Sequence, residues 1–207
     1  MSRLEIRLLG GFDVRYGGEP VTGFESQKVR ALFAYLTVLR DRGHSRDDLM
    51  GLLWADADGD SARRSLRQSL YNLRAAFQKV GAESPMATSR QSVRMAPEVE
   101  YWLDLEAFER TRSRGMVARG ADRIHHLAGA VELFRGDLLK GFAVRDAPEF
   151  EDWMAVEQEK YREAAADSLR TLVDNTLRDH ILEQFMLVFG ILLATATSVK
   201  SAGSRER

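Results

Sequence analysis

Apolar residues recur at helical spacing through residues 61–80. At roughly 100° per residue, six of them fall on one stripe of a helix, namely Ala62, Leu66, Leu70, Leu73, Phe77 and Val80. Polar and cationic side chains occupy the opposite face. The pattern therefore predicts an amphipathic helix, with Asp60 or Ser61 as its N-terminal cap.

The segments in front of this helix show two further patterns. Residues 4–21 alternate between apolar and polar positions around two Gly-Gly pairs, which predicts short antiparallel strands joined by glycine turns. A helix capped by Ser26 follows, and a second begins at the motif formed by Ser45 and Asp48 and ends at Trp54. A small sheet is thus followed by two helices and then by the helix at residues 61–80.

The remainder of the chain divides into a hairpin and a helical part. Residues 86–103 favour two short strands around Ser89-Arg90-Gln91, closed by Pro97. From Asp104 onward the spacing is helical, and a long helix starts after Pro148. We expect three segments: a folded unit at residues 1–103, a helical unit at residues 104–177 and an apolar tail at residues 178–207.

The polar face of the predicted helix is cationic. Residues 61–77 hold four arginines and no acidic residue, although the whole chain has 30 basic and 31 acidic side chains. The solvated faces of helices usually carry both acidic and basic side chains, because an acidic residue four positions from an arginine stabilises the helix by about 0.3 kcal/mol. A row of arginines without such partners favours contact with a large anion such as nucleic acid, the alternative being an ordinary solvated face.

Several motifs occur in the order typical of a known family. They are "LLGGFDVRYGGEPV", "SQKVRALFAYL", "LLWADADGDSARRSLRQSLYNLRAAF", "YWLDLEAFE", "LFRGDLLKGF" and "APEFEDWMAVEQEKYREAAADSLRTL". Over about residues 3–177 the chain resembles the antibiotic regulatory proteins of actinomycetes and their relatives. The resemblance implies an α+β fold: a response-regulator-like winged helix-turn-helix with an N-terminal β-sheet, followed by an all-α, tetratricopeptide-like, partial bacterial transcriptional activator domain.

The resemblance also implies a function and a set of functional residues. It indicates a sequence-specific transcriptional activator that binds promoter direct repeats as double-stranded DNA, contacts RNA polymerase and pairs with a second copy on DNA. The residues expected to contact DNA are Arg63, Arg64, Arg67, Gln68, Tyr71, Asn72 and Arg74 on the helix, and Ser89, Arg90 and Arg94 on the hairpin. In the loop before the helix, Asp56, Asp58 and Asp60 are candidates for contact with RNA polymerase.

Other chemistries find little support in the sequence. The chain has no cysteine, which excludes disulfides and thiolate metal sites. The "DADGD" loop has its glycine at the fourth position and Arg67 where a calcium loop needs its glutamate. His125 and His126 point in different directions on a helix, and no phosphate-binding glycine loop is present. We therefore expect no enzyme activity, no metal, no cofactor and no small-molecule substrate.

Location and the tail allow two expectations. The first residues lead directly into a strand pattern, so we expect no signal peptide and a cytoplasmic protein. The uncharged run Gln184–Val199 has 16 residues, fewer than the roughly 20 that span a bilayer. We expect a buried or interface helix there, and a membrane anchor flanked by Arg178 and Lys200 is the alternative.

A second function class stays open at this point. The chain can also be interpreted as a helical protein-interaction adaptor, or as a fragment of a larger regulator that has lost productive DNA binding. Salt-dependent binding to duplex DNA separates the two classes, because a protein that displaces counterions from DNA binds more weakly as salt rises.

Overall fold

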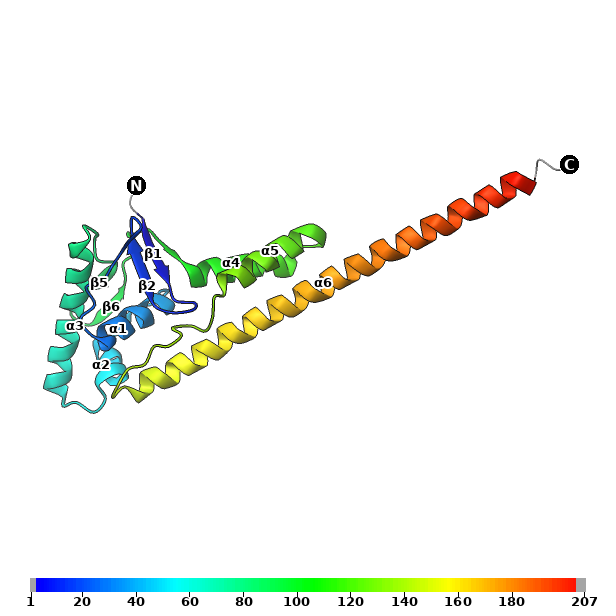
Figure 1. Cartoon of the computed structure of the whole chain (residues 1–207). Helices are drawn as coiled ribbons and strands as arrows, with labels where there is room; N and C mark the ends of the chain where they lie inside the picture. The colour runs from blue at the N-terminus through cyan, green and yellow to red at the C-terminus, as the bar shows by residue number, and fades with distance from the viewer. Residues whose placement is uncertain (1–2, 204–207) are drawn as a thin grey trace.

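The computed structural model describes the backbone of residues 3–203 and the side chains of residues 3–177. Its elements are β1 (Leu4–Arg7), β2 (Asp13–Tyr16), β3 (Glu19–Pro20), α1 (Gln27–Val38), β4 (His44–Ser45), α2 (Arg46–Trp54), α3 (Gly59–Lys79), β5 (Met86–Thr88), β6 (Ser92–Met95), β7 (Tyr101–Leu103), α4 (Asp104–Val117), α5 (Gly120–Leu133) and α6 (Pro148–Gly203). Figure 1 shows the strands and α1–α3 gathered at one end, and α4 and α5 lying beside α6. The fold is α+β, with a sheet at its N-terminus, as the sequence predicted.

Two small sheets frame the helices of the first part. One has the strand order β3-β2-β1-β7, in which β1 runs antiparallel to β2 and parallel to β7. The other has the order β4-β6-β5 and is antiparallel throughout. The strands expected within residues 4–21 and 86–103 are confirmed, but β7 was not predicted because its pairing joins residues far apart in the sequence.

Local signals place the starts of the first two helices correctly. The Ser26 hydroxyl accepts a hydrogen bond from the Val29 amide at 3.3 Å, and that of Ser45 accepts one from the Asp48 amide at 3.0 Å. The cap of α3 was predicted wrongly. Asp58 fills that position, because its carboxylate accepts from the amides of Asp60 at 3.1 Å and Ser61 at 2.9 Å. As a result α3 begins at Gly59.

An aromatic cluster forms the centre of the first part. The rings of Phe33 on α1 and Phe77 on α3 are both fully buried, with centroids 5.5 Å apart. Phe24 packs against both of them, and Phe12 reaches the cluster from the loop between β1 and β2. This packing holds α3 against α1, so that the opposite face of α3 points outward.

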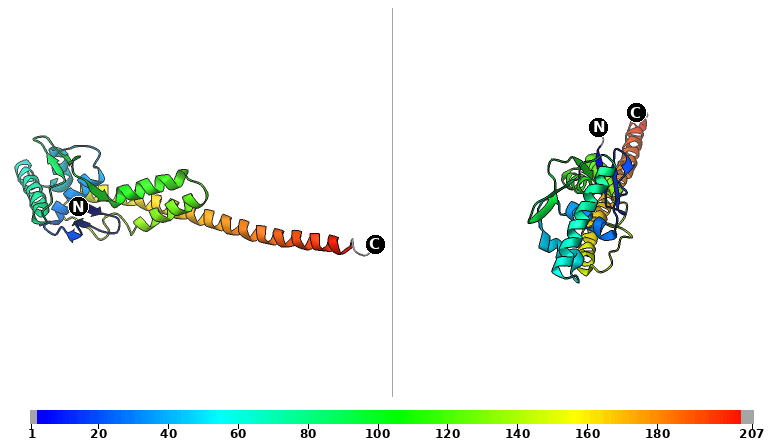
Figure 2. Two further views of the ribbon diagram at one scale, coloured as in Figure 1. Left: turned by 90° about the horizontal axis from the view of Figure 1, so that it is seen from above. Right: turned by 90° about the vertical axis from the view of Figure 1, so that its left-hand side faces the viewer.

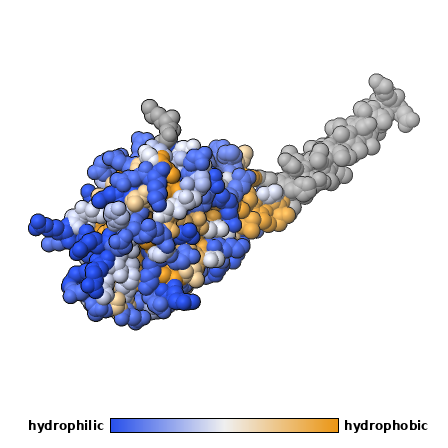
Figure 3. Space-filling view, turned by 60° about the vertical axis from the view of Figure 1, so that its left-hand side comes forward, coloured by the Kyte–Doolittle hydropathy of each residue, from blue (hydrophilic) through white to orange (hydrophobic). Residues whose placement is uncertain are grey.

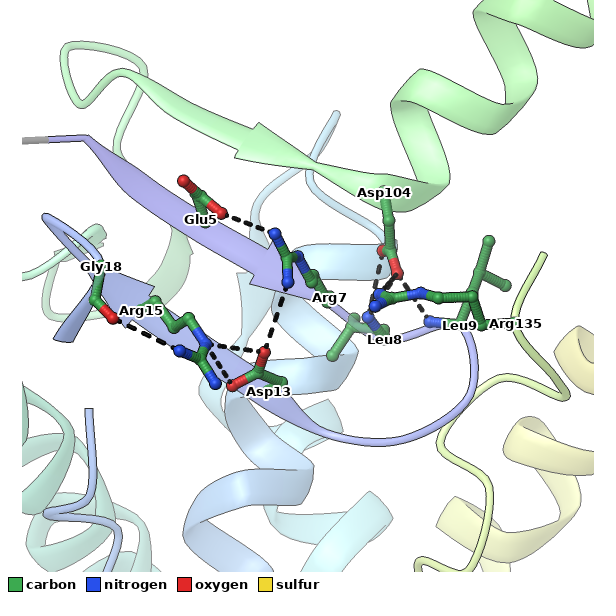
Figure 4. A network of polar contacts seen from close by, with 9 residues as sticks. All are labelled: Glu5, Arg7, Leu8, Leu9, Asp13, Arg15, Gly18, Asp104 and Arg135. Atoms are coloured by element: carbon green, nitrogen blue, oxygen red, sulfur yellow. Dashed lines mark hydrogen bonds and ion pairs between the residues drawn. The ribbon is translucent and has the colours of Figure 1, made fainter. Parts of the chain in front are cut away.

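A buried carboxylate joins the N-terminal sheet to α4. Asp104, the first residue of α4, accepts hydrogen bonds from the amides of Leu8 at 2.9 Å and Leu9 at 2.8 Å, and Arg135 lies 3.8 Å away (Figure 4). Burial raises the pKa of Asp104, and these hydrogen bonds oppose that rise. The Leu139 amide also donates to the Leu8 carbonyl at 2.8 Å. The N-terminal sheet and the helical part are therefore in direct contact. The boundary between two domains near residue 104 stays a prediction.

The helices after Asp104 pack closely. A Cβ at Gly115 would lie 2.8 Å from the Leu127 side chain, so glycine allows α4 and α5 to approach each other. At the start of α6, Trp153 packs on Tyr35 of α1 with ring centroids 4.8 Å apart.

Within the described part of the chain, no helix is both long and apolar enough to cross a membrane. The side chains of the predicted apolar tail lie outside the described residues, so its burial stays a prediction.

Candidate nucleic-acid interface

The outward face of α3 carries the cationic residues that the sequence singled out. Arg63, Arg64, Arg67 and Arg74 are all exposed, together with Gln68 and Tyr71. In the right-hand view of Figure 2, α3 lies in front of the other elements. In Figure 3, the surface on this side of the molecule is mostly hydrophilic. The buried face consists of Ala62, Leu66, Ser69, Asn72, Leu73, Ala76 and Phe77. Leu70 and Val80, expected on the apolar stripe, are only half-buried.

One arginine of this face has an acidic partner. Arg63 pairs with Asp60 at 2.7 Å, and both side chains are largely exposed, so the pair contributes little to stability. The expectation that no acidic partner lies within the helix was wrong, because α3 begins early enough to include Asp60. Among the described residues, no carboxylate lies within ion-pair distance of Arg64, Arg67 or Arg74. The face therefore keeps an excess of positive charge.

Asn72 lies beneath this face and is not exposed on it. Its side chain is 6% exposed, and its amide nitrogen donates to the Glu25 carboxylate at 2.6 Å. Its amide oxygen accepts a hydrogen bond from Gln68 at 2.9 Å. The side chain turns inward because Glu25, in the loop before α1, offers a strong acceptor there. A direct DNA contact by Asn72 would require these bonds to break.

The three predicted residues of the β5–β6 hairpin are exposed but are used differently. Ser89 shapes the turn, since its hydroxyl accepts from the amides of Gln91 at 3.2 Å and Ser92 at 2.9 Å. Arg90 lies at the exposed tip of the turn. Arg94 lies on β6, beside a separate cleft that it shares with Arg40 and other residues of the turn after α1. Arg94 is therefore not grouped with the arginines of α3.

Sequence reasoning missed one cation of this surface. The guanidinium of Arg46 donates to the Ser89 carbonyl at 2.9 and 3.1 Å, and its amide donates to the Gln91 carbonyl at 3.0 Å. These bonds attach the hairpin turn to the first residue of α2. A cation at a helix N-terminus opposes the helix dipole, and this unfavourable placement was the available sequence signal.

A cleft brings the hairpin and α3 together. It has a volume of about 590 Å³ and is lined by Ser45, Arg46, Asp47, Met50, Arg63, Leu66, Arg67, Arg90 and Gln91. Four of these residues are arginines and only Asp47 is acidic. A concave, positively charged surface of this kind suits the phosphate backbone of a nucleic acid.

The acidic candidates Asp56 and Asp58, in the loop before α3, and Asp60, in the first turn of α3, are exposed, but two of the three have partners within the chain. Asp58 caps α3, and Asp60 pairs with Arg63. Hydrogen bonds from Ser61 hold the pKa of Asp58 below its usual value of 3.8. In the part of the chain that the structure describes, no three metal-binding side chains are clustered.

The cap at Asp58 leads to a prediction with a defined pH dependence. A lowered folded-state pKa stabilises the fold above about pH 3.8, and this contribution is lost as pH falls through the folded-state pKa. At neutral pH, Asp58→Ala should therefore lower the urea midpoint of unfolding, and the difference from the parent should shrink at pH 3 and below. A constant difference across this range would contradict a charged cap.

The structure is that of an α+β protein with a cationic surface that suits nucleic acid. Comparisons with known proteins agree with the fold. The chain is similar to the transcriptional regulatory protein EmbR of Mycobacterium bovis and Mycobacterium tuberculosis, at 29% identity over 144 residues, covering 67% of this chain and 37% of the relative. The solved structure of Mycobacterium tuberculosis EmbR in complex with low affinity phosphopeptide has a TM-score of 0.68 and 24% identity, covering 92% of this chain and 52% of that one. No family model matches the chain.

These comparisons bear on the expectations in different degrees. The solved structure supports the α+β fold with its N-terminal sheet. The curated relatives are named as transcriptional regulators, which agrees with the expectation of a protein that is not an enzyme. The chain spans little more than a third of the length of those relatives. What it binds and regulates therefore belongs to the proposal below.

Proposed function

We propose that this chain is a sequence-specific DNA-binding transcriptional regulator. In the proposal residues 1–103 form a winged helix-turn-helix whose α3 enters the major groove, and the β5–β6 hairpin lies on the adjacent backbone as the wing. Residues 104–177 form a partial, tetratricopeptide-like activator domain. The observation that carries the proposal is the exposed arginine face of α3, continuous with the arginine-lined cleft.

The sizes and charges of the surface suit duplex DNA. The major groove of B-DNA is about 12 Å wide and admits one α-helix. α3 has 21 residues and exposes polar side chains along its outward face. Arginine can read guanine with two hydrogen bonds, whereas contacts to phosphate position the protein without reading sequence. Arg67 and Arg64 are proposed for base contact, and Arg46 and Arg90 for phosphate contact.

The remaining parts of the proposal rest on the family resemblance. They are binding to promoter direct repeats by two copies, activation, and contact with RNA polymerase through the exposed loop before α3. Asp56 is the best candidate for the polymerase contact, because Asp58 and Asp60 have partners within the chain. A role on promoter DNA would place the chain in the cytoplasm.

The proposal predicts a large effect of Arg67→Ala on DNA binding. The variant should lose about 5- to 100-fold in affinity for a bound duplex, as removal of one base-reading arginine does. Fluorescence anisotropy of the full chain at several salt concentrations measures this. Arg170→Ala is the matched control, because Arg170 is 75% exposed on α6, far along the chain from the proposed groove contacts. Equal affinities for Arg67→Ala, the control and the parent would contradict the groove assignment.

A second candidate function, the protein-interaction adaptor, has one observation in its favour. Leu169, Val173 and Leu177 lie four residues apart on α6 and are 48%, 46% and 56% exposed. Such a row of apolar side chains suits contact with another helix. Parent protein that binds no duplex DNA even at low salt would favour the adaptor.

A further inference from the structure

A chain of three side chains connects the exposed face of α3 to the loop in front of α1. The Asn72 amide nitrogen donates to the Glu25 carboxylate at 2.6 Å, and the Gln68 amide nitrogen donates to the Asn72 oxygen at 2.9 Å. Gln68 and Glu25 are exposed, whereas Asn72 is buried between them. A carboxylate beside a helix that binds DNA would repel phosphate, and here that carboxylate is the acceptor for the buried Asn72 amide.

The chemistry of the three groups determines which way each amide points. An ionised carboxylate only accepts hydrogen bonds, so Asn72 must turn its NH₂ group toward Glu25. Its oxygen then faces Gln68, and Gln68 must in turn direct an N–H group toward Asn72. The two ends of an amide have nearly the same shape, and without this chain Gln68 could point either end outward.

The fixed orientation decides what Gln68 can offer to a ligand. One of its N–H groups is occupied by Asn72, which leaves the carbonyl oxygen and one N–H group. In the major groove adenine presents a donor beside an acceptor, whereas guanine presents two acceptors. The remaining groups of Gln68 therefore match adenine and do not match guanine.

We propose that Glu25 is a positioning residue that acts through Asn72 to hold the Gln68 amide in the orientation that reads adenine. The inference rests on the proposed function, because it needs α3 to lie in the major groove. It adds that part of the sequence preference is set by a residue of the loop before α1, outside the helix that reads the bases.

In the test, the full-length parent, Gln68→Ala and Glu25→Gln each select duplexes from a random pool. The base preference at each position of the selected duplexes is then compared among the three proteins. Gln68→Ala identifies the base pair at which the preference for adenine is lost. Glutamine at position 25 can both donate and accept, so Asn72 is no longer held in one orientation. Glu25→Gln should reduce the adenine preference at that same base pair by about 5-fold or more and leave the other positions unchanged.

Two further variants separate this role from simpler ones. Asn72→Ala breaks the chain at its middle and should reduce the same preference. Glu19→Gln removes an exposed carboxylate on β3 and should leave every base preference as in the parent. Loss of negative charge alone strengthens binding to all sequences alike, and a purely structural role of Glu25 lowers the thermal midpoint without altering base preference.

Two results would overturn the inference about Glu25, and a third would overturn the proposed function as well. If Glu25→Gln and the parent select the same bases at the position read by Gln68, the inference is overturned while DNA binding stands. If Gln68→Ala alters no position, Gln68 does not read a base and the inference is again overturned. A parent chain that selects no sequence overturns the proposed function, and this inference with it.

Discussion

Replacing Phe77 with alanine is expected to lower the free energy of unfolding by about 3–5 kcal/mol. The Phe77 ring is fully buried and lies 5.5 Å from that of Phe33 and 6.1 Å from that of Phe24, measured between centroids. Removing it leaves a cavity between α1 and α3 that the surrounding rings can only partly fill. The helix that carries the proposed DNA contacts would lose much of its attachment to the core.

Urea unfolding followed by circular dichroism measures this change. Tyr71→Ala is the matched control, because it also removes an aromatic ring from α3 but one that is 64% exposed. Its unfolding midpoint should stay close to that of the parent. Equal midpoints for Phe77→Ala and Tyr71→Ala would show that α3 does not pack on α1 as described.

Features that depend on a few neighbouring residues were predicted well. Ser26 and Ser45 cap their helices because each hydroxyl reaches an amide three residues ahead, which the sequence spacing specifies directly. The strands of residues 4–21 follow from alternation, because one face of that sheet is buried. The start of α3 was misplaced because several acidic and hydroxyl residues there can each serve as a cap.

Features that depend on long-range pairing were not predicted. The β7 strand has three residues, too few for an alternating pattern to be recognised, and it forms beside β1 only when the chain has folded. Asp104 was placed at the start of the helical region, but its partners Leu8 and Leu9 are about 96 positions away. No local pattern reports such a contact.

In the candidate interface too, features set by neighbouring residues were predicted and features set by distant residues were not. The outward direction of the α3 arginines follows from the helical period, since the apolar stripe fixes the buried side. The burial of Asn72 depends on Glu25, and the role of Arg46 depends on the Ser89 carbonyl of the hairpin. Both partners come from other elements, so the helical period alone could not identify them.

Asp104→Ala is expected to lower the free energy of unfolding by about 2–5 kcal/mol. The carboxylate is the acceptor for the buried amides of Leu8 and Leu9, and each buried amide left without an acceptor costs about 1–3 kcal/mol. The Arg135 ion pair contributes less, because its 3.8 Å distance is long and the arginine is half exposed. The backbone hydrogen bonds therefore dominate the effect of Asp104.

Arg135→Ala separates these two contributions, since it removes the ion pair and leaves the carboxylate with its backbone donors (Figure 4). Its midpoint in urea should fall by much less than that of Asp104→Ala. Hydrogen exchange of the Leu8 and Leu9 amides gives a second measurement, because both should exchange faster in Asp104→Ala and remain protected in Arg135→Ala. If Arg135→Ala is as destabilising as Asp104→Ala, the ion pair, and not the backbone hydrogen bonds, joins the N-terminal sheet to α4.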